Sequence, residues 1–182
     1  MDVQATDEEL LAAFVRGDRA ALGELARRHE PHLLGLAMGL LGGCPSAARD
    51  AVQETWLRVI KHAAGFNGRS SLKTWLYRIA INRCRDLRGR TVAHCARGAH
   101  PAETDDADPG QSTMHGEDLG VLRQAVSNLT PVKQEVLLLC YHEGMTHEQV
   151  AVVLEMPVGT VKSRLHAALQ ELREQLANEV KR

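Results

Sequence analysis

The segment between Gly98 and Leu122 restricts what this chain can fold into more than any other feature. It holds six acidic residues and no lysine or arginine, and it also contains Pro101 and Pro109. An acidic segment that is rich in turn-forming residues and poor in apolar ones cannot bury enough surface to fold. The sequence therefore predicts a flexible acidic linker between two small domains. The expected boundaries are 1–92 for the first domain, 93–118 for the linker and 119–182 for the second domain.

The composition predicts that both domains are helical. Hydrophobic residues make up 44% of the 182 residues, which is enough for a core, whereas aromatic residues make up only 3%. Few strand-preferring residues are left, while the abundant Ala, Leu, Glu and Arg favour helix. The most apolar run, from Leu33 to Cys44, is too short to cross a bilayer. We therefore expect an all-α protein that stays in the cytoplasm.

The thiol and metal chemistry suggested by the sequence is limited. The four cysteines are widely spaced and form no C-x-x-C pair: Cys44, Cys84, Cys95 and Cys140. Reduced thiols are therefore expected. His94 and His100 lie near two of these cysteines, but the spacing matches no standard zinc pattern. We expect no metal and no cofactor, and we find no placed nucleophile or paired carboxylates that would indicate an enzyme.

Apolar periodicity predicts four helices before the linker. A capping box from Thr6 to Glu9 begins the first helix, which ends near Gly17. Pro31 is expected to break or kink the second helix, because its ring removes a backbone hydrogen bond. The fourth helix carries most of a basic segment, 69–90, that holds seven basic residues and one acid and is suited to face phosphates. The second, third and fourth helices are expected at 18–41, 46–64 and from 72 to about 90.

The second domain shows the pattern of a helix-turn-helix. Helices are expected over 119–129 and from Pro131 to Glu143. A second capping box, from Thr146 to Gln149, begins a short helix that stops at a turn over 155–158. The helix after this turn has one apolar stripe. Two short helices that meet at a tight corner are typical of a unit that reads duplex DNA.

The last helix carries the residues that we expect to contact DNA. In a helix-turn-helix the second helix lies in the major groove, where its early outward residues reach bases and phosphates. No acidic residue lies between Met156 and Gln170, so nothing on this face repels the phosphates. The expected contact residues are Thr160, Lys162, Ser163, Arg164 and His166, of which Arg164 suits bidentate pairing with guanine. The alternative is an ordinary amphipathic hairpin with a solvated basic face.

Five stretches of sequence resemble the extracytoplasmic-function (ECF) sigma factors of the sigma-70 family. The motifs LTPVKQEVLLL (129–139), GMTHEQVA (144–151) and PVGTVKSRLH (157–166) are similar to region 4 of that family. In the first domain, DAVQETWL (50–57) is similar to region 2.2, and FNGRSSLKTWLYRIAIN (66–82) is similar to regions 2.3 and 2.4. The two sets occur in the order that the family shows.

The resemblance implies a subunit that directs bacterial RNA polymerase to promoters. It implies that the second domain binds the −35 element as duplex, while the first domain melts the −10 element without ATP and holds core polymerase. The polymerase contacts implied are the clamp of the largest subunit and the flap. It also implies control by an anti-sigma factor.

The resemblance assigns two sets of residues in the first domain. Unpaired −10 bases are expected to contact Asn67, Ser70, Lys73, Trp75, Tyr77, Arg78, Asn82 and Arg83, which combine stacking surfaces with positive charge. Trp75 fits the core equally well. The clamp is expected to contact Asp50, Gln53 and Glu54, which share one helix face; a solvated face is the alternative. Trp56 fits the core better than an interface.

Two positions depart from the family pattern. Glu155 stands in the turn where the family commonly has glycine, and it must fit that turn without glycine's conformational freedom. Arg49 stands where an acid usually precedes Asp50, which weakens the acidic patch.

Two other functions remain open on the residues alone. A repressor or activator that binds duplex DNA as a dimer uses the same motif, but it does not need the segment 66–90. An enzyme acting on DNA, such as a recombinase, needs catalytic groups that we do not find.

Overall fold

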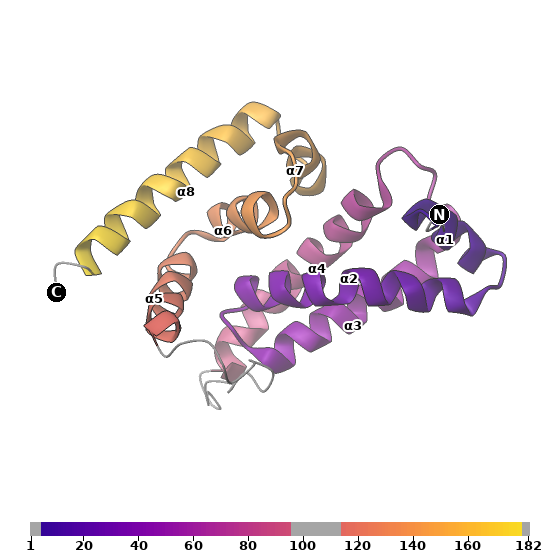
Figure 1. The fold of residues 1–182 in the computed structure, drawn as a ribbon, viewed down its shortest axis with the longest axis horizontal. Helices are drawn as coiled ribbons and strands as arrows, with labels where there is room; N and C mark the ends of the chain where they lie inside the picture. The colour runs from indigo at the N-terminus through magenta and orange to yellow at the C-terminus, as the bar shows by residue number, and fades with distance from the viewer. Residues whose placement is uncertain (1–4, 96–113, 180–182) are drawn as a thin grey trace.

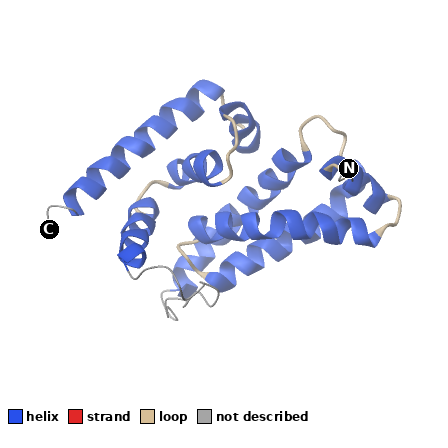
Figure 2. Cartoon of the chain, in the orientation of Figure 1, coloured by secondary structure: helices blue, strands red, loops and turns tan. Residues whose placement is uncertain are grey.

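The computed structural model describes residues 5–95 and 114–179, and the side chains of 5–88 and 120–179. Within these ranges every regular element is helical, as predicted (Figure 2). Helices α1–α4 form the first domain and α5–α8 the second (Figure 1). Most of the predicted linker lies outside the described residues. No helix in these ranges is long and apolar enough to cross a membrane.

The first domain is a bundle of four helices whose bounds lie close to the predictions. The Thr6 capping box is present, with Thr6 N donating to Glu9 Oε2 at 2.8 Å and Glu9 N donating to Thr6 Oγ1 at 3.2 Å. Leu33, Leu36 and Ile81 are fully buried in the bundle core, where each large apolar side chain contributes about 2 kcal/mol. The elements are α1 (Asp7–Val15), α2 (Arg19–Leu40), α3 (Pro45–His62), the 3₁₀ turn η1 (Ala63–Gly65) and α4 (Leu72–Cys95).

Helix α2 is continuous through Pro31, which the sequence predicted to break or kink it. Pro31 is exposed, while Leu25, Leu33 and Leu36 hold the buried face on both sides of it. Because these leucines anchor both halves in the same core, the helix tolerates the missing backbone hydrogen bond. The prediction of a break is therefore wrong.

Acidic residues at the start of α1 join that helix to the middle of α2 and to the start of α4. Asp7 contacts Arg28 of α2 at 3.0 Å and His29 Nε2 at 2.6 Å. Glu8 Oε1 accepts from the backbone N of Leu72 at 2.8 Å, so a carboxylate of α1 satisfies an unpaired donor at the start of α4. Helix α1 therefore fixes where α4 begins.

The second domain places a helix-turn-helix at the end of the chain. The core contains Val136, Leu139, Val150 and Val161, all fully buried. Thr130 precedes the first-turn proline as predicted, but its side chain makes no capping hydrogen bond. The elements are α5 (Met114–Ser127), α6 (Pro131–Leu137), the π-helical turn η2 (Leu138–His142), α7 (His147–Leu154) and α8 (Val158–Glu179).

The two domains pack against each other. Helices α5 and α6 and turn η2 contact α2, and α7 contacts α4. In Figure 1, α6 and α7 lie beside the first domain, while α8 lies on the far side of the second domain. The face of α4 that meets α7 is therefore an interface within the chain.

The cysteines differ in state. Cys84 and Cys140 are free thiols, and burial raises the pKa of the Cys84 thiol to about 12. Cys44 is disulfide-bonded, so the expectation of reduced thiols is wrong at this position. A disulfide needs two Cα atoms within about 4.4–6.8 Å. Sequence spacing does not show which cysteines the fold brings that close.

Candidate nucleic-acid interface

The corner between α7 and α8 is built as the sequence predicted. The second capping box is present, with Thr146 N donating to Gln149 Oε1 at 2.9 Å and Gln149 N donating to Thr146 Oγ1 at 3.3 Å. Helix α7 ends at Leu154 with Glu155 as its C-cap, and the backbone N of Met156 donates to Ala151 O at 3.0 Å. These bonds fix the orientation of α8 relative to α7.

Glu155 adopts the left-handed backbone conformation in this turn, with φ 54° and ψ 48°. Among the described residues it is the one non-glycine residue with positive φ. A side chain costs about 1 kcal/mol in this conformation, which glycine adopts freely. The turn therefore forms without glycine, because Glu155 itself takes up the left-handed conformation that glycine adopts most readily.

The outward face of α8 is accessible. Lys162, Ser163 and His166 are exposed, whereas Thr160 and Arg164 are half-buried. Ser163 Oγ donates to Thr160 O at 3.0 Å, and Arg164 Nη1 lies 3.8 Å from the sulfur of Met156. The apolar stripe on the other side of α8 is anchored by Val161, Leu165, Ala168 and Leu172. All five predicted −35 residues therefore lie on the first turns of one helix, with Lys162, Ser163 and His166 turned away from its buried face and Thr160 and Arg164 at the edges of that face.

The loop before α4 is held by polar contacts of its own. Asn67 is exposed, and its Oδ1 accepts from the backbone N of Arg69 at 3.2 Å. Ser70 is half-buried. The rings of Phe66 and Trp75 lie 5.3 Å apart and are tilted by 53°, so both aromatic side chains pack together beside the core. Trp75 therefore packs against the core but stays partly exposed.

Lys73, Tyr77 and Arg78 on α4 all contact the second domain. Lys73 Nζ donates to the carbonyl of Glu143 at 2.8 Å, and the Tyr77 hydroxyl donates to the Glu143 carboxylate. Arg78 Nη2 donates to the carbonyl of Val152 at 2.8 Å. Burial and the carboxylate of Glu143 raise the pKa of Tyr77 above its ordinary value. Tyr77 is only 1% exposed, so in this arrangement DNA cannot reach it.

Asn82 and Arg83, further along α4, make polar contacts within their own domain. Asn82 is exposed, and its Oδ1 accepts from Arg85 Nη1 at 3.4 Å. Arg83 is half-buried, with Nε 3.8 Å from Glu54 and Nη1 3.6 Å from Asp86. The eight predicted residues therefore do not form one open surface.

Helix α3 presents the polar residues predicted to bind polymerase. Asp50 and Gln53 are exposed, while Glu54 is half-buried beside Arg83. Leu57 and Ile60 are also exposed, by 54% and 45%. Asp50, Gln53, Leu57 and Ile60 are three or four residues apart and so share one face of the helix. Helical periodicity groups Ile60 with the apolar stripe of α3, but the structure leaves it exposed, and the predicted polymerase site did not include Leu57.

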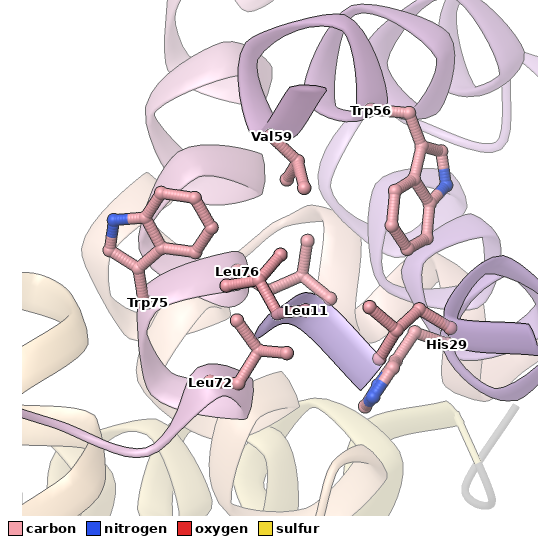
Figure 3. A pocket seen from close by; sticks show the side chains of 8 residues that line it. Leu11, His29, Trp56, Val59, Leu72, Trp75 and Leu76 are labelled. Atoms are coloured by element: carbon pink, nitrogen blue, oxygen red, sulfur yellow. The ribbon is translucent and has the colours of Figure 1, made fainter. Parts of the chain in front are cut away.

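An apolar cavity lies between α1, α2, α3 and α4. Trp56 and Trp75 point toward it from α3 and α4, with His29 and Leu76 among its lining side chains (Figure 3). Its volume of about 10 Å³ is close to the minimum that holds one water and far below the 300–1,000 Å³ of typical ligand pockets. Trp56 packs against the core as expected, and the cavity is a packing defect rather than a ligand site.

No metal centre is evident in the part of the chain that the structure describes. Among those residues, no three His, Cys, Asp or Glu side chains are grouped to hold an ion. The side chains of His94, Cys95 and His100, which had suggested a metal, lie outside the described ones.

Two buried carboxylates that sequence reasoning missed are central to the domain interface. Glu135 accepts from Arg85 at 2.7 and 3.0 Å, and its side chain is 2% exposed. The side chain of Glu143 is fully buried against Tyr77 and His142. One signal was present, because Glu135 stands directly before the apolar run 136–140, where a charge would need a partner if buried.

Comparison with known proteins agrees with this architecture. The profile of Sigma-70 region 2 matches residues 25–92, and that of Sigma-70, region 4 matches residues 119–172. The RNA polymerase sigma-H factor of Pseudomonas aeruginosa is 30% identical over 183 residues, which cover 94% of each chain. The ECF RNA polymerase sigma factor SigE of Mycolicibacterium smegmatis is 34% identical over 187 residues, which cover 96% of this chain and 71% of the relative.

Two solved structures share the fold. The sigma factor RpoE of Bartonella quintana, in complex with the anti-sigma factor NepR, aligns with a TM-score of 0.68 and 25% identity. The alignment covers 85% of this chain and 96% of that one. CnrH, in complex with the cytosolic domain of CnrY, aligns with a TM-score of 0.74 and 24% identity over 94% and 97% of the two chains.

The fold and the site define a helical two-domain protein with a C-terminal helix-turn-helix. The chain belongs to the extracytoplasmic-function sigma factors of the sigma-70 family. The resemblance drawn from the motifs is confirmed, and a dimeric repressor or activator is not favoured. Below, region 2 denotes residues 25–92 and region 4 denotes residues 119–172.

Proposed function

We propose that the protein directs core RNA polymerase to a set of promoters through three surfaces, and that it does so by binding rather than by catalysis. The two predicted domains, 1–92 and 119–182, bind different partners in this proposal. The observation that carries this proposal is the pairing of a helix-turn-helix whose reading face is exposed with a second basic helix, α4, in the other domain. A simple duplex-binding regulator does not need the second surface.

Region 4 binds the −35 element as duplex in this scheme. Arg164 pairs with a guanine edge, and Lys162, Ser163, Thr160 and His166 contact neighbouring bases and phosphates. The exposure of Lys162, Ser163 and His166 supports this role, as does the lack of acidic residues on the early turns of α8.

Region 2 captures the unpaired −10 element. The loop residues Asn67 and Ser70 lie directly before α4, whose donors and aromatic side chains suit unstacked bases. Binding energy for those bases offsets the cost of unpairing. The α4 residues in this proposal are Lys73, Trp75, Tyr77, Arg78, Asn82 and Arg83.

The exposed face of α3 binds the polymerase clamp. Asp50, Gln53 and Glu54 supply acceptors for a basic partner helix, and Leu57 and Ile60 add apolar area beside them. Such a polar and apolar combination is typical of interfaces that form and dissociate. Arg49 is exposed next to Asp50 and lowers the negative charge of this surface.

Regulation and location follow from the proposed partners. The sigma factor RpoE of Bartonella quintana was solved in complex with NepR, which is described as an anti-sigma factor. We propose that an anti-sigma factor controls this chain as well. The site of action is the cytoplasm, where core polymerase and promoter DNA are found.

Promoter-dependent transcription with purified core polymerase tests this proposal. The wild-type chain should co-purify with core enzyme and yield promoter-specific transcripts. Replacing Arg164 with alanine should lower the transcript yield by roughly tenfold to a hundredfold, since one bidentate base contact is worth about 1–3 kcal/mol. Asn82→Ala should impair opening of the −10 element, seen as weaker permanganate reactivity of its thymines.

Arg173→Ala is the matched control for Arg164→Ala. Arg173 is an exposed arginine on the same helix, about two turns beyond the last proposed contact, His166, so its loss removes the same charge. It should leave transcription within about twofold of wild type. Absence of any core-dependent transcript from the wild-type chain would overturn the proposed function.

A further inference from the structure

The first turn of α1 holds three consecutive acidic residues, and each has a different partner. Glu9 bonds within its own capping box, and Asp7 bonds to α2. Glu8 bonds to α4, because its Oε1 accepts from the backbone N of Leu72 at 2.8 Å, 64 positions further along the chain. An acid in a first turn is ordinarily explained by the dipole of its own helix. That explanation does not require a bond to another helix, so the contact of Glu8 needs a reason of its own.

Leu72 is the first residue of α4 and directly follows the loop 66–71, which is proposed to hold unpaired −10 bases. The first backbone N–H groups of a helix have no partner within the helix. Ser71 satisfies one of them, since the backbone N of Thr74 donates to Ser71 Oγ at 3.2 Å. A side chain in that place reaches the second or third position of a helix but not the first. The N–H of Leu72 therefore needs an acceptor from elsewhere, and Glu8 supplies it.

The loop 66–71 is anchored at both ends and exposed between them. At its start, the ring of Phe66 packs against that of Trp75 with 5.3 Å between the centroids. Asn67 and Arg69 in its middle are exposed. Among the described residues, Glu8 is the one hydrogen-bond partner of residues 66–72 from outside the segment 63–75. Helix α1 therefore holds the end of the loop that joins α4.

Helix α1 is fixed in the bundle on the side that carries Glu8. Leu11 lies three residues after Glu8, so the two side chains share one face of the helix. Leu11 is 2% exposed and lines the same small cavity as Leu72 and Leu76 of α4 (Figure 3). Asp7 lies 2.6 Å from His29 Nε2 and so holds the start of α1 against α2. The Glu8 carboxylate is therefore presented to α4 from a helix that is packed into the same core.

We propose that Glu8 is a positioning residue for capture of the −10 element: its bond to Leu72 N holds the loop 66–71 in the arrangement that receives unpaired bases. The proposal rests on the proposed function of that loop and extends it to α1, which precedes the residues 25–92 that match region 2. Glu8 itself does not contact DNA. It acts through Asn67 and Ser70, because a loop whose end is already fixed loses less conformational entropy when a base binds.

Glu8→Ala and Glu8→Gln separate the acceptor from the charge. Alanine removes the acceptor, whereas glutamine keeps a carbonyl oxygen and loses only the charge. The matched control is Glu30→Ala, because Glu30 is an exposed acid of α2 without a hydrogen bond or ion pair among the described residues. Each variant is assembled with core polymerase at equal holoenzyme concentration. Opening of the −10 element is then measured by the permanganate reactivity of its thymines.

Glu8→Ala should lower the thymine reactivity roughly fivefold, the scale of losing one helix cap, while Glu8→Gln and Glu30→Ala stay within about twofold of wild type. All variants should co-purify with core enzyme equally, and circular dichroism checks that they keep their helices.

A double-mutant comparison distinguishes positioning from a merely structural role. If Glu8 acts through the loop side chains, Glu8→Ala should lower the reactivity by less than about twofold in a chain that already carries Asn67→Ala/Ser70→Ala. A general loss of stability would instead add in full to the effect of the loop variant, because it does not depend on the loop side chains.

The outcomes separate this role of Glu8 from the proposed function. If wild type opens the promoter and Glu8→Ala opens it equally well within about twofold, Glu8 does not position the loop and the proposed function stands. An equal loss in Glu8→Gln and Glu8→Ala, or full additivity with the loop variant, also overturns the role, because the charge or the overall stability is then responsible. If wild type gives no transcript with core enzyme, the proposed function fails, and the role of Glu8 fails with it.

Discussion

The two basic surfaces of this protein, on α8 and on α4, are alike in sequence but differ in accessibility. Lys162, Ser163 and His166 on α8 are exposed, and no helix of region 2 covers them. Tyr77 on α4 is fully buried, and Lys73 is bound to region 4. The comparison shows that a positively charged helix becomes a DNA-binding surface only when its neighbours leave it free.

The largest expected effect concerns the strength of the contact that covers α4. Because Glu135 is buried, a double-mutant cycle with Arg85→Ala and Glu135→Ala should give a coupling energy of about 1.5–3 kcal/mol in urea unfolding.

The matched control for this cycle is Arg58→Ala with Asp86→Ala. That pair joins α3 to α4 at 3.6 Å, but both side chains are about half exposed. Its coupling energy should stay below about 1 kcal/mol, as for other surface pairs. Equal values for the two cycles would mean that the buried contact contributes no more than a surface one.

The ionisation of Tyr77 gives the next largest effect. The chain has two tyrosines, so in Tyr141→Phe the phenolate absorbance near 295 nm reports on Tyr77 alone. Burial and Glu143 raise its pKa, so the folded chain keeps it protonated above the ordinary value of about 10. A phenol whose pKa is higher in the folded chain than in the unfolded chain contributes stability that is fully present below the pKa of the unfolded chain. This contribution is lost as the pH rises from the unfolded pKa toward the folded pKa.

A variant that separates α2 from η2 completes this test, since an added Cβ would lie 2.7 Å from His142 at Gly35 and 2.8 Å from Leu138 at Gly39, but has no neighbour within 4 Å at Gly23. Adding Gly35→Gln/Gly39→Gln to Tyr141→Phe should bring the titration of Tyr77 back toward pH 10. Gly23→Gln should not change it. An unchanged titration midpoint in both backgrounds would show that region 4 does not cover the phenol.

The smallest expected effect lies in the turn before the exposed surface. Glu155→Gly should raise the free energy of unfolding by about 0.5–1 kcal/mol, because glycine adopts the left-handed conformation without strain. Glu155→Ala keeps the strain and removes the same contact with Arg78, so it should show no such gain. A gain of equal size in both variants would point to the carboxylate rather than to the backbone.

Much of this organisation was predictable because it depends on local patterns. Both capping boxes formed at Thr6 and Thr146, where the spacing of hydroxyl and acid or amide allows reciprocal bonds. Lys162, Ser163 and His166 of the residues assigned to α8 are exposed, because helical spacing dictates which side chains point outward. Ile60 shows the limit of this reasoning, since a residue on the edge of an apolar stripe can end up exposed.

The sequence by itself determined the helices, the helix-turn-helix and the basic character of α4, since these follow from periodicity and charge within short segments. Only the tertiary structure decided that α4 is covered. Arg85, Tyr77 and Arg78 of α4 contact region 4 residues that lie 50, 66 and 74 positions further along the chain. No local pattern encodes such pairings, because they depend on how two separately folded domains fit together.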